Sequence, residues 1–251
     1  GKKTMNYREL PWDSAFFGLP VASMDIVERD TPEAVQRAID ESTAGLVYAF
    51  LSPEIQTRFE GVLQKFGALY DEKVFYEKTL APPVPTPTLP EGFSSGMVDQ
   101  PLPELYALAR ASSWDSRFAK DPCLAPKVGE LYDLWIEKGL SVPGHGIVGT
   151  YDDRRDHVLC AMVSFKLAEG IGTIELVAVD SRCRHRGLGR ALLTLVDGIL
   201  FEQGAAHVGV YTQKTNLGAC RLYESHRFSV GHIRNVWHLY KSTKNKQVPP
   251  K

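Results

Sequence analysis

Residues 172–203 read GTIELVAVDSRCRHRGLGRALLTLVDGILFEQ, and they combine three local patterns in one segment. Residues 174–179 are short, rich in β-branched side chains and bounded by turn residues, so they predict a strand. Apolar residues then recur at helical spacing over residues 192–200, and Gly204 follows, which predicts an amphipathic helix. A basic, glycine-rich turn joins the strand to the helix.

This turn, residues 184–189, has the composition of a phosphate-binding loop. Glycine lets the backbone approach a ligand because no Cβ stands in the way. The first N–H groups of the following helix have no acceptor within the helix and carry the positive end of its dipole, so a pyrophosphate fits there. An ordinary basic turn is the alternative. A Rossmann fingerprint is excluded because Leu192 stands where glycine or alanine is needed, and a P-loop because Gly-Lys-Ser/Thr is absent.

Composition limits the classes of function. The chain has 251 residues, 43% hydrophobic and 24% charged, which is typical of a soluble globular protein. Its net charge of −1 gives no reason to expect a nucleic-acid partner. No apolar run approaches the roughly 20 residues that span a bilayer, and residues 1–14 contain no signal core, so we expect a cytoplasmic protein with no membrane partner. The histidines and cysteines follow no metal-binding spacing, so no metal site is expected.

A proline-rich segment divides the chain. Five prolines lie among residues 81–90, and such a segment is extended and cannot build a sheet core. We predict a reduced N-terminal α/β lobe over residues 1–81, a linker over 82–92, a second domain over 93–241 and a disordered tail over 242–251. The strand–helix–strand order of residues 47–80 recurs at 208–240. We therefore interpret the N-terminal lobe as a degenerate, ligand-free copy of half of the second domain.

Three other segments carry local predictions. Residues 7–27 predict strand-like runs and turns, and the aromatic cluster at 12–18 is interpreted as packing. Residues 92–96 match G-x-S-x-G, but the flanking prolines exclude the strand-to-helix context of a nucleophile elbow, so they predict a turn. Residues 112–122 combine polar, aromatic and charged side chains, as a binding loop often does.

Two motifs resemble those of the GNAT N-acetyltransferase family. The R-x-x-G-x-G spacing of residues 184–189, between a strand and an apolar helix, resembles its acyl-CoA-binding motif. The run NLGACRLY is similar to the family's N-x-x-A-x-x-x-Y helix, and its spacing places Asn216 and Tyr223 on one helix face. The family usually has glycine where this chain has Arg227, a departure that touches no catalytic atom.

The resemblance implies an α/β (α+β) fold, with a mixed, mostly antiparallel central sheet flanked by helices. The smaller N-terminal α/β lobe would then resemble a truncated GNAT half. The implied activity is acyl-CoA-dependent N-acetyl transfer, with acetyl-CoA or another short acyl-CoA as co-substrate and no metal. The cofactor contacts that it implies are Val177, Ala178, Val179, Arg184, His185, Arg186, Gly187, Leu188, Gly189, Arg190, Asn216 and Ala219.

Acetyl transfer to an amine needs a neutral nitrogen, a donor for the developing oxyanion and a proton for the departing thiolate. The resemblance implies that Tyr223 gives this proton to the CoA sulfur, and that backbone N–H groups of residues 177–179 polarise the carbonyl. Glu175 is a candidate base acting through water, because strand alternation predicts it on one face with Val177 and Val179. A solvated carboxylate, with water alone removing the proton, is the alternative.

Short segments further resemble the bacterial TDP-fucosamine N-acetyltransferases, which acetylate the 4-amino group of a TDP-4-amino-4,6-dideoxyhexose. These segments are residues 12–18, 116–118 and 131–137, together with the Asn216/Tyr223 pair. The resemblance implies a small-molecule acceptor, a TDP-linked amino sugar, and leaves a homodimer open.

The loop of residues 112–122 would supply the acceptor contacts. Arg117 suits the nucleotide diphosphate because guanidinium groups fit phosphate oxygens, although an exposed surface arginine is the alternative. Trp114 or Phe118 would stack on the thymine or the hexose.

Two other functions stay open. The acceptor amine could belong to an antibiotic, another metabolite, a protein lysine or an N-terminus. A degenerate domain could instead act as a non-enzymatic CoA-binding module. The intact Arg184/Gly187/Gly189 turn together with Tyr223 argues against that module.

Overall fold

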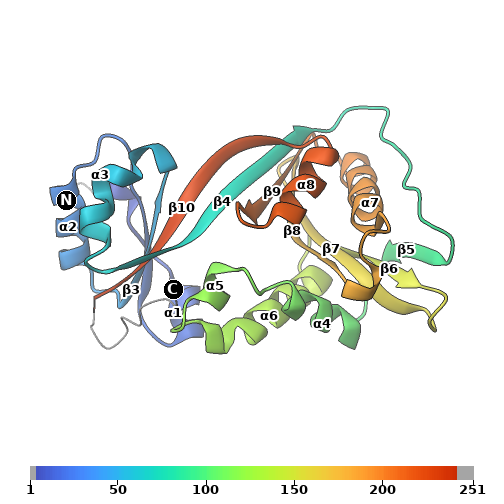
Figure 1. Cartoon of the computed structure of the whole chain (residues 1–251), viewed down its shortest axis with the longest axis horizontal. Coiled ribbons are helices and arrows are strands. Elements are labelled where there is room, and N and C mark those ends of the chain that lie inside the picture. Colours follow the sequence, from blue (N-terminus) through green and yellow to red (C-terminus); the bar gives the residue numbers. More distant parts are fainter. Residues whose placement is uncertain (1–3, 242–251) are drawn as a thin grey trace.

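Strands build most of the framework within residues 4–241, the part of the chain that this computed structural model describes (Figure 1). The strands are β1 (Arg8–Glu9), β2 (Val21–Asp25), β3 (Leu46–Leu51), β4 (Gly67–Thr79), β5 (Phe93–Met97), β6 (His145–Asp152), β7 (Val158–Ala168), β8 (Ile171–Val179), β9 (His207–Gln213) and β10 (Ser229–Tyr240). They form one ten-stranded sheet in the order β1-β2-β3-β10-β4-β9-β8-β7-β6-β5. The predicted tail, residues 242–251, lies outside the described residues.

Helices flank this sheet. They are α1 (Pro11–Phe17), α2 (Pro32–Glu41), α3 (Pro53–Leu63), α4 (Pro103–Ala111), α5 (Arg117–Lys120), α6 (Val128–Ser141), α7 (Leu188–Glu202) and α8 (Leu217–Ser225), with 3-10 turns η1 (Thr4–Asn6), η2 (Ala125–Lys127) and η3 (Ser181–Cys183). Among the described helices, none is long and apolar enough to cross a membrane. Among the described strands, only the pairs β2–β3 and β8–β9 are parallel. The predicted mixed, mostly antiparallel sheet is confirmed.

The two halves of the chain repeat one arrangement. The order β2–α2–β3–α3–β4 in the first half recurs as β8–α7–β9–α8–β10 in the second. The last strand of each half pairs with the other half, because β10 lies between β3 and β4, and β4 lies between β10 and β9. Figure 1 shows β4 and β10 side by side across the middle of the molecule. The N-terminal lobe thus resembles a truncated GNAT half, as predicted.

The proline-rich segment connects β4 to β5 along the outside of the molecule (Figure 1). Strand β4 precedes this segment, yet its two neighbours in the sheet, β9 and β10, both follow it. The sheet is therefore continuous across the predicted linker at residues 82–92. The division of the chain into domains at that linker stays a prediction.

Helices pack on both faces of the C-terminal half of the sheet. Consecutive strand residues point to opposite faces, and Met162 and Val163 of β7 show this division. Val163 packs with Leu192 of α7, whereas Met162 packs with Leu105 of α4 and Ile136 of α6. Two apolar clusters therefore hold α7 on one face and α4 with α6 on the other.

Two local predictions were wrong. Residues 11–17 form helix α1 instead of strand-like runs, because Pro11 suits the first helical turn and Gly18, at φ 74°, ends the helix. Residues 93–97 form edge strand β5 instead of a turn, since they pair with β6 from Phe93↔Asp152 to Met97↔Val148. Strand formation by such a polar, glycine-containing run depends on this partner rather than on propensity.

Helix α2 allows a test of local sequence signals. The Thr31 side chain accepts a hydrogen bond from the backbone N–H of Ala34 at 3.2 Å, which confirms the predicted N-cap. We expect Thr31→Ala to lower the free energy of unfolding by about 1 kcal/mol, as measured by urea denaturation. The control is Ser52→Ala at the start of α3, where the side chain makes no capping bond. Equal losses in both variants would contradict the capping argument.

Candidate active site

The parallel strands β8 and β9 separate partway along their length. Their pairing covers Ile171–Ile174 with His207–Val210, although β8 continues to Val179 and β9 to Gln213. Past Ile174, the β8 edge that faces β9 therefore has no ladder partner. In the N-terminal half, by contrast, every residue of β2 pairs with β3. Of the two parallel pairs, only β8–β9 opens and leaves backbone groups free for a ligand.

A β-bulge lies where β8 and β9 begin to separate. Phe165 of β7 pairs with Ile174 and Ser164 pairs with Leu176, so Glu175 is the extra residue. Such a bulge re-aims side chains, and Ile174 packs with α7 whereas Leu176 packs with α4 and α6. The strand alternation predicted for Glu175 is therefore interrupted at this residue.

Glu175 is paired with a histidine. Its carboxylate lies 3.2 Å from Nδ1 of His145 on β6. Burial lowers the pKa of His145, while the nearby Glu175 carboxylate partly opposes that shift. Val177 and Val179, which were predicted on the same face as Glu175, pack instead with the α7 cluster.

The basic turn between β8 and α7 is exposed. Arg184, His185, Arg186 and Gly187 are all solvent-accessible, whereas the Leu188 side chain is buried in the core. The first backbone bond of the helix runs from Ala191 N to Gly187 O at 3.0 Å. The N–H groups of residues 188–190 therefore have no acceptor inside α7.

Glycine is required at one position of this turn. Gly187 has φ 77°, and a Cβ built there would meet no heavy atom within 4 Å. The space beside Gly187 is therefore open, and its backbone conformation is one that other residues adopt only with strain. Together with the free N–H groups of α7, this geometry fits a pyrophosphate.

Arg184 of the turn and Arg190 of α7 each donate a hydrogen bond to a nearby carbonyl group. Arg184 Nε donates to the Val179 carbonyl at 3.3 Å, and Arg190 Nη2 donates to the Ser225 carbonyl at 2.9 Å. The first bond ties the turn to the end of β8, and the second ties it to the end of α8.

Helix α8 begins at the open end of β9. The Asn216 side-chain oxygen caps the helix by accepting from Ala219 N at 3.1 Å. A hydrogen bond from Asn216 also lowers the pKa of Asp115, although burial raises that pKa by more. The predicted cofactor residue Asn216 is thus held by the backbone on one side and by a carboxylate on the other.

Tyr223 lies two turns further along α8 and is only 4% exposed. Its ring packs 5.7 Å from Tyr76 and 5.8 Å from Phe228, measured between ring centroids. Burial raises the pKa of Tyr223 above its usual value near 10. The phenol therefore stays protonated at neutral pH, which is the form that donates a proton.

The three predicted acceptor residues lie in different surroundings. Trp114 is 69% exposed, whereas Phe118 stacks 6.0 Å from Phe17. The Arg117 guanidinium lies 4.2 Å from the ring centroids of both Tyr48 and Phe118. It also lies 3.0 Å from a ring nitrogen of His238, whose pKa burial lowers to about 4. Arg117 is thus half-buried among aromatic rings rather than free on the surface.

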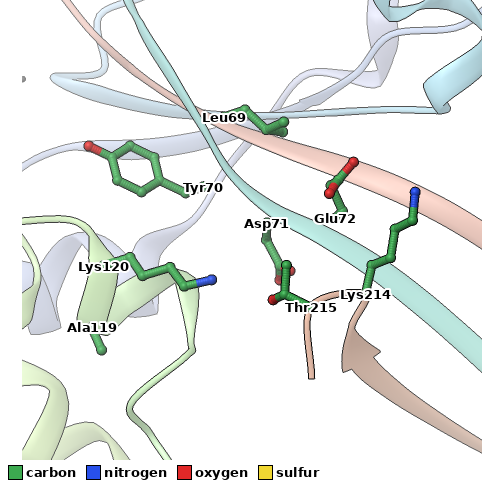
Figure 2. A pocket seen from close by; sticks show the side chains of 8 residues that line it. All are labelled: Leu69, Tyr70, Asp71, Glu72, Ala119, Lys120, Lys214 and Thr215. Carbon is green, nitrogen blue, oxygen red and sulfur yellow. The ribbon is translucent and has the colours of Figure 1, made fainter. Parts of the chain in front are cut away.

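A pocket of about 430 Å³ opens between β4, α5 and the loop that leads into α8 (Figure 2). No pattern in the sequence predicted this pocket, because the residues of β4 belong to the predicted N-terminal lobe. The one signal there was an Asp-Glu-Lys run within a predicted strand, where acidic residues are uncommon. The residues that line the pocket are Leu69, Tyr70, Asp71, Glu72, Ala119, Lys120, Lys214 and Thr215.

Groups of three or more histidine, cysteine or acidic side chains that could hold a metal are absent from residues 4–241.

Comparisons with known proteins point to one family. Residues 108–228 match the model of the acetyltransferase (GNAT) family. None of the curated protein sequences compared with this chain matches it.

Solved structures resemble nearly the whole chain. A GCN5-related N-acetyltransferase from Sphaerobacter thermophilus has a TM-score of 0.62 at 17% identity, over 93% of this chain and 76% of that one. A tandem GNAT protein from the clavulanic acid biosynthesis pathway has a TM-score of 0.58 at 14% identity, over 90% and 76%. A GCN5-related N-acetyltransferase from Kribbella flavida has a TM-score of 0.52 at 17% identity, over 88% and 81%. At such identities the likeness shows the fold alone. Taken with the match of residues 108–228 to the family model, it supports an acyl-CoA-dependent N-acetyltransferase with the GNAT fold; members of that family use acetyl-CoA.

Proposed function

We propose that this enzyme transfers an acetyl group from acetyl-CoA to the amino group of a TDP-linked amino-deoxy sugar, by direct attack in a ternary complex. The observation that carries the transfer is the separation of β8 from β9 beside the exposed glycine turn. The sugar nucleotide as acceptor rests on the sequence resemblance, and the presence of a pocket beside β4 supports it.

The glycine turn is the proposed site for the pyrophosphate of acetyl-CoA. The free N–H groups of residues 188–190 and the exposed side chains of Arg184 and Arg186 would neutralise its charge. The unpaired edge of residues 177–179 would hydrogen-bond the acyl arm and polarise the thioester carbonyl. Asn216 and Ala219 would line the other side of the arm, at the start of α8.

Tyr223 is the proposed proton donor to the departing sulfur. Its raised pKa keeps the phenol protonated, which is the form that can give a proton to the thiolate. Glu175 remains a candidate for removing the proton of the amine through water. Its pairing with His145 would hold the carboxylate in place and compete with that role.

The pocket beside β4 is the proposed acceptor site. Lys120 and Lys214 are exposed and lie on opposite sides of the pocket in Figure 2, so their charges would complement a diphosphate. Trp114, exposed on the α4–α5 loop, offers a ring for the thymine. Arg117 would act as a second cation nearby. The same resemblance extends the proposal to a homodimer, which sedimentation velocity would test.

Calorimetric titration of acetyl-CoA, with and without TDP, tests this function. We expect acetyl-CoA to bind with a dissociation constant on the order of micromolar, and TDP to alter that binding. If TDP does not change acetyl-CoA binding, the proposed acetyl transfer is retained but the sugar nucleotide is rejected as the acceptor. Thermal stabilisation by a lysine peptide but not by TDP would replace the sugar with a protein amine. Failure of acetyl-CoA to bind would contradict the whole proposal.

A further inference from the structure

One carboxylate in the acceptor pocket has an unsatisfied oxygen. Asp71 lies in the middle of β4 and is 4% exposed, yet no described residue donates a hydrogen bond to its Oδ1. The residue lines the pocket of about 430 Å³, and Figure 2 shows its side chain directed into it, between Lys120 and Thr215. Buried polar atoms in folded proteins almost always have a partner, so an exception that faces a cavity points to a ligand.

Asp115 repeats this feature from the α4–α5 loop. It is also 4% exposed, and its Oδ2 has no partner among the described residues. The Asp115 charge raises the pKa of Asp71, so the two carboxylates act on each other. Two buried carboxylates with unpartnered oxygens favour a cationic group at this point of the pocket, beside the lysines that would face a diphosphate.

Asp71 titrates close to neutral pH. Burial raises its pKa to about 6 despite the opposing charges of nearby cations. At pH 7 the carboxylate is ionised, and it can still accept a proton. The groups that face it from the surrounding elements are Lys73 on β4, Arg117 and Lys120 on α5, Asp115 in the α4–α5 loop and Tyr132 on α6.

We propose that Asp71 binds the ammonium group of the acceptor and takes its proton. This inference rests on the proposed acetyl transfer and names the residue that receives the proton. Asp71 comes from the N-terminal half of the chain, whereas Tyr223 and the glycine turn come from the other half. The exchange of β4 into the second half places Asp71 beside the loop that leads into α8, the helix that carries Tyr223.

The pocket adjoins the start of α8. The backbone N–H of Lys214 donates to the Glu72 carbonyl at 2.8 Å, which holds the 214–216 loop against β4. That loop leads into the helix that carries Tyr223. The neighbouring acid is not equivalent, because in Figure 2 Glu72 lies nearer Lys214 and away from Asp71.

In the proposed step, Asp71 accepts one proton and Tyr223 donates another. A proton passes from the ammonium nitrogen to Oδ1 of Asp71, and the freed lone pair forms a bond to the acyl carbon. The carbon–sulfur bond breaks with its electron pair on sulfur, which takes a proton from Tyr223, and the new amide nitrogen loses its second proton to water. Asp71 then releases its proton to water, and Tyr223 regains one from water. The net products are the amide, free CoA and one proton.

The test compares Asp71→Asn with wild type, using TDP-4-amino-4,6-dideoxyhexose and a panel of simple primary amines. Asparagine keeps the size but loses the charge. We expect kcat/KM for the acceptor to fall about 30-fold, with the acetyl-CoA dissociation constant unchanged. The rise of wild-type kcat/KM with pH through about 6 should disappear, because only the ionised carboxylate accepts a proton. The control is Glu77→Gln, an exposed acid on the same strand outside the pocket.

A binding measurement without turnover separates a charge effect from a loss of shape. Wild type should bind the amino sugar nucleotide more tightly than its 4-hydroxy analogue, and Asp71→Asn should bind both alike. If wild type acetylates an amine and Asp71→Asn retains kcat/KM within threefold, this inference is overturned and the acetyl transfer stands. If Glu175→Gln alone removes the pH dependence, the proton goes to Glu175 instead. If wild type acetylates none of these amines, both proposals fall.

Discussion

Tyr223→Phe is expected to lower kcat by about 1000-fold, within the range of 10² to 10⁴ that general acid catalysis contributes. The reason is that the thiolate of CoA then departs without a proton. No described residue makes a hydrogen bond to the Tyr223 hydroxyl, so phenylalanine fills the same buried space at little cost in stability. Acetyl-CoA affinity, measured by calorimetry, should stay within about threefold of wild type, because only one proton donor is lost.

Tyr76→Phe is the matched control for that variant. The Tyr76 ring lies 5.7 Å from that of Tyr223, but its hydroxyl donates to Glu224 at 2.8 Å. We expect it to lower the free energy of unfolding by about 1 kcal/mol and to leave kcat nearly unchanged. A Tyr223→Phe enzyme that turns over within fivefold of wild type would remove Tyr223 as the acid. Because the pKa of Tyr223 is raised, deprotonation of this residue should cause no loss of wild-type activity up to pH 9.

Gly187→Val should weaken acetyl-CoA binding by at least about 100-fold. A loss of that size corresponds to two or more charge-assisted hydrogen bonds to a phosphate. Valine at φ 77° is strained, and its methyl groups would enter the open space beside the free N–H groups of α7. Both effects disturb the turn where the pyrophosphate is proposed to bind. Calorimetric titration of acetyl-CoA measures the change.

Gly204→Val controls for strain. Gly204 follows the other end of α7, has φ 93° and likewise has no heavy atom within 4 Å of a built Cβ. Both variants should lose about 1–3 kcal/mol of stability, but only Gly187→Val should lose acetyl-CoA affinity. Gly187→Asn, which tolerates positive φ, should keep more affinity than valine. Normal binding by Gly187→Val would refute the proposed pyrophosphate site.

Local signals in the sequence predicted the central strand–turn–helix unit well. The predicted strand at residues 174–179 falls within β8, and the predicted helix is α7. Both follow from short-range physics: the spacing of apolar side chains, the free N–H groups at a helix start and the conformational freedom of Gly187. The Thr31 cap and the family resemblance carried by Tyr223 are equally local. Such features need only neighbouring residues, so they can be recognised in the sequence.

The tertiary structure decided the rest, because it depends on partners far away in the chain. The β-bulge at Glu175 exists only in register with β7, and β5 exists only because β6 pairs with it. Asp71 reaches the pocket between β4 and α5 because β4 lies between β9 and β10, two strands more than 100 residues later. No local pattern specifies which strands exchange between the halves. Long-range burial of apolar surface selects that pairing, and it places a carboxylate with an unpartnered oxygen in the pocket between β4 and α5.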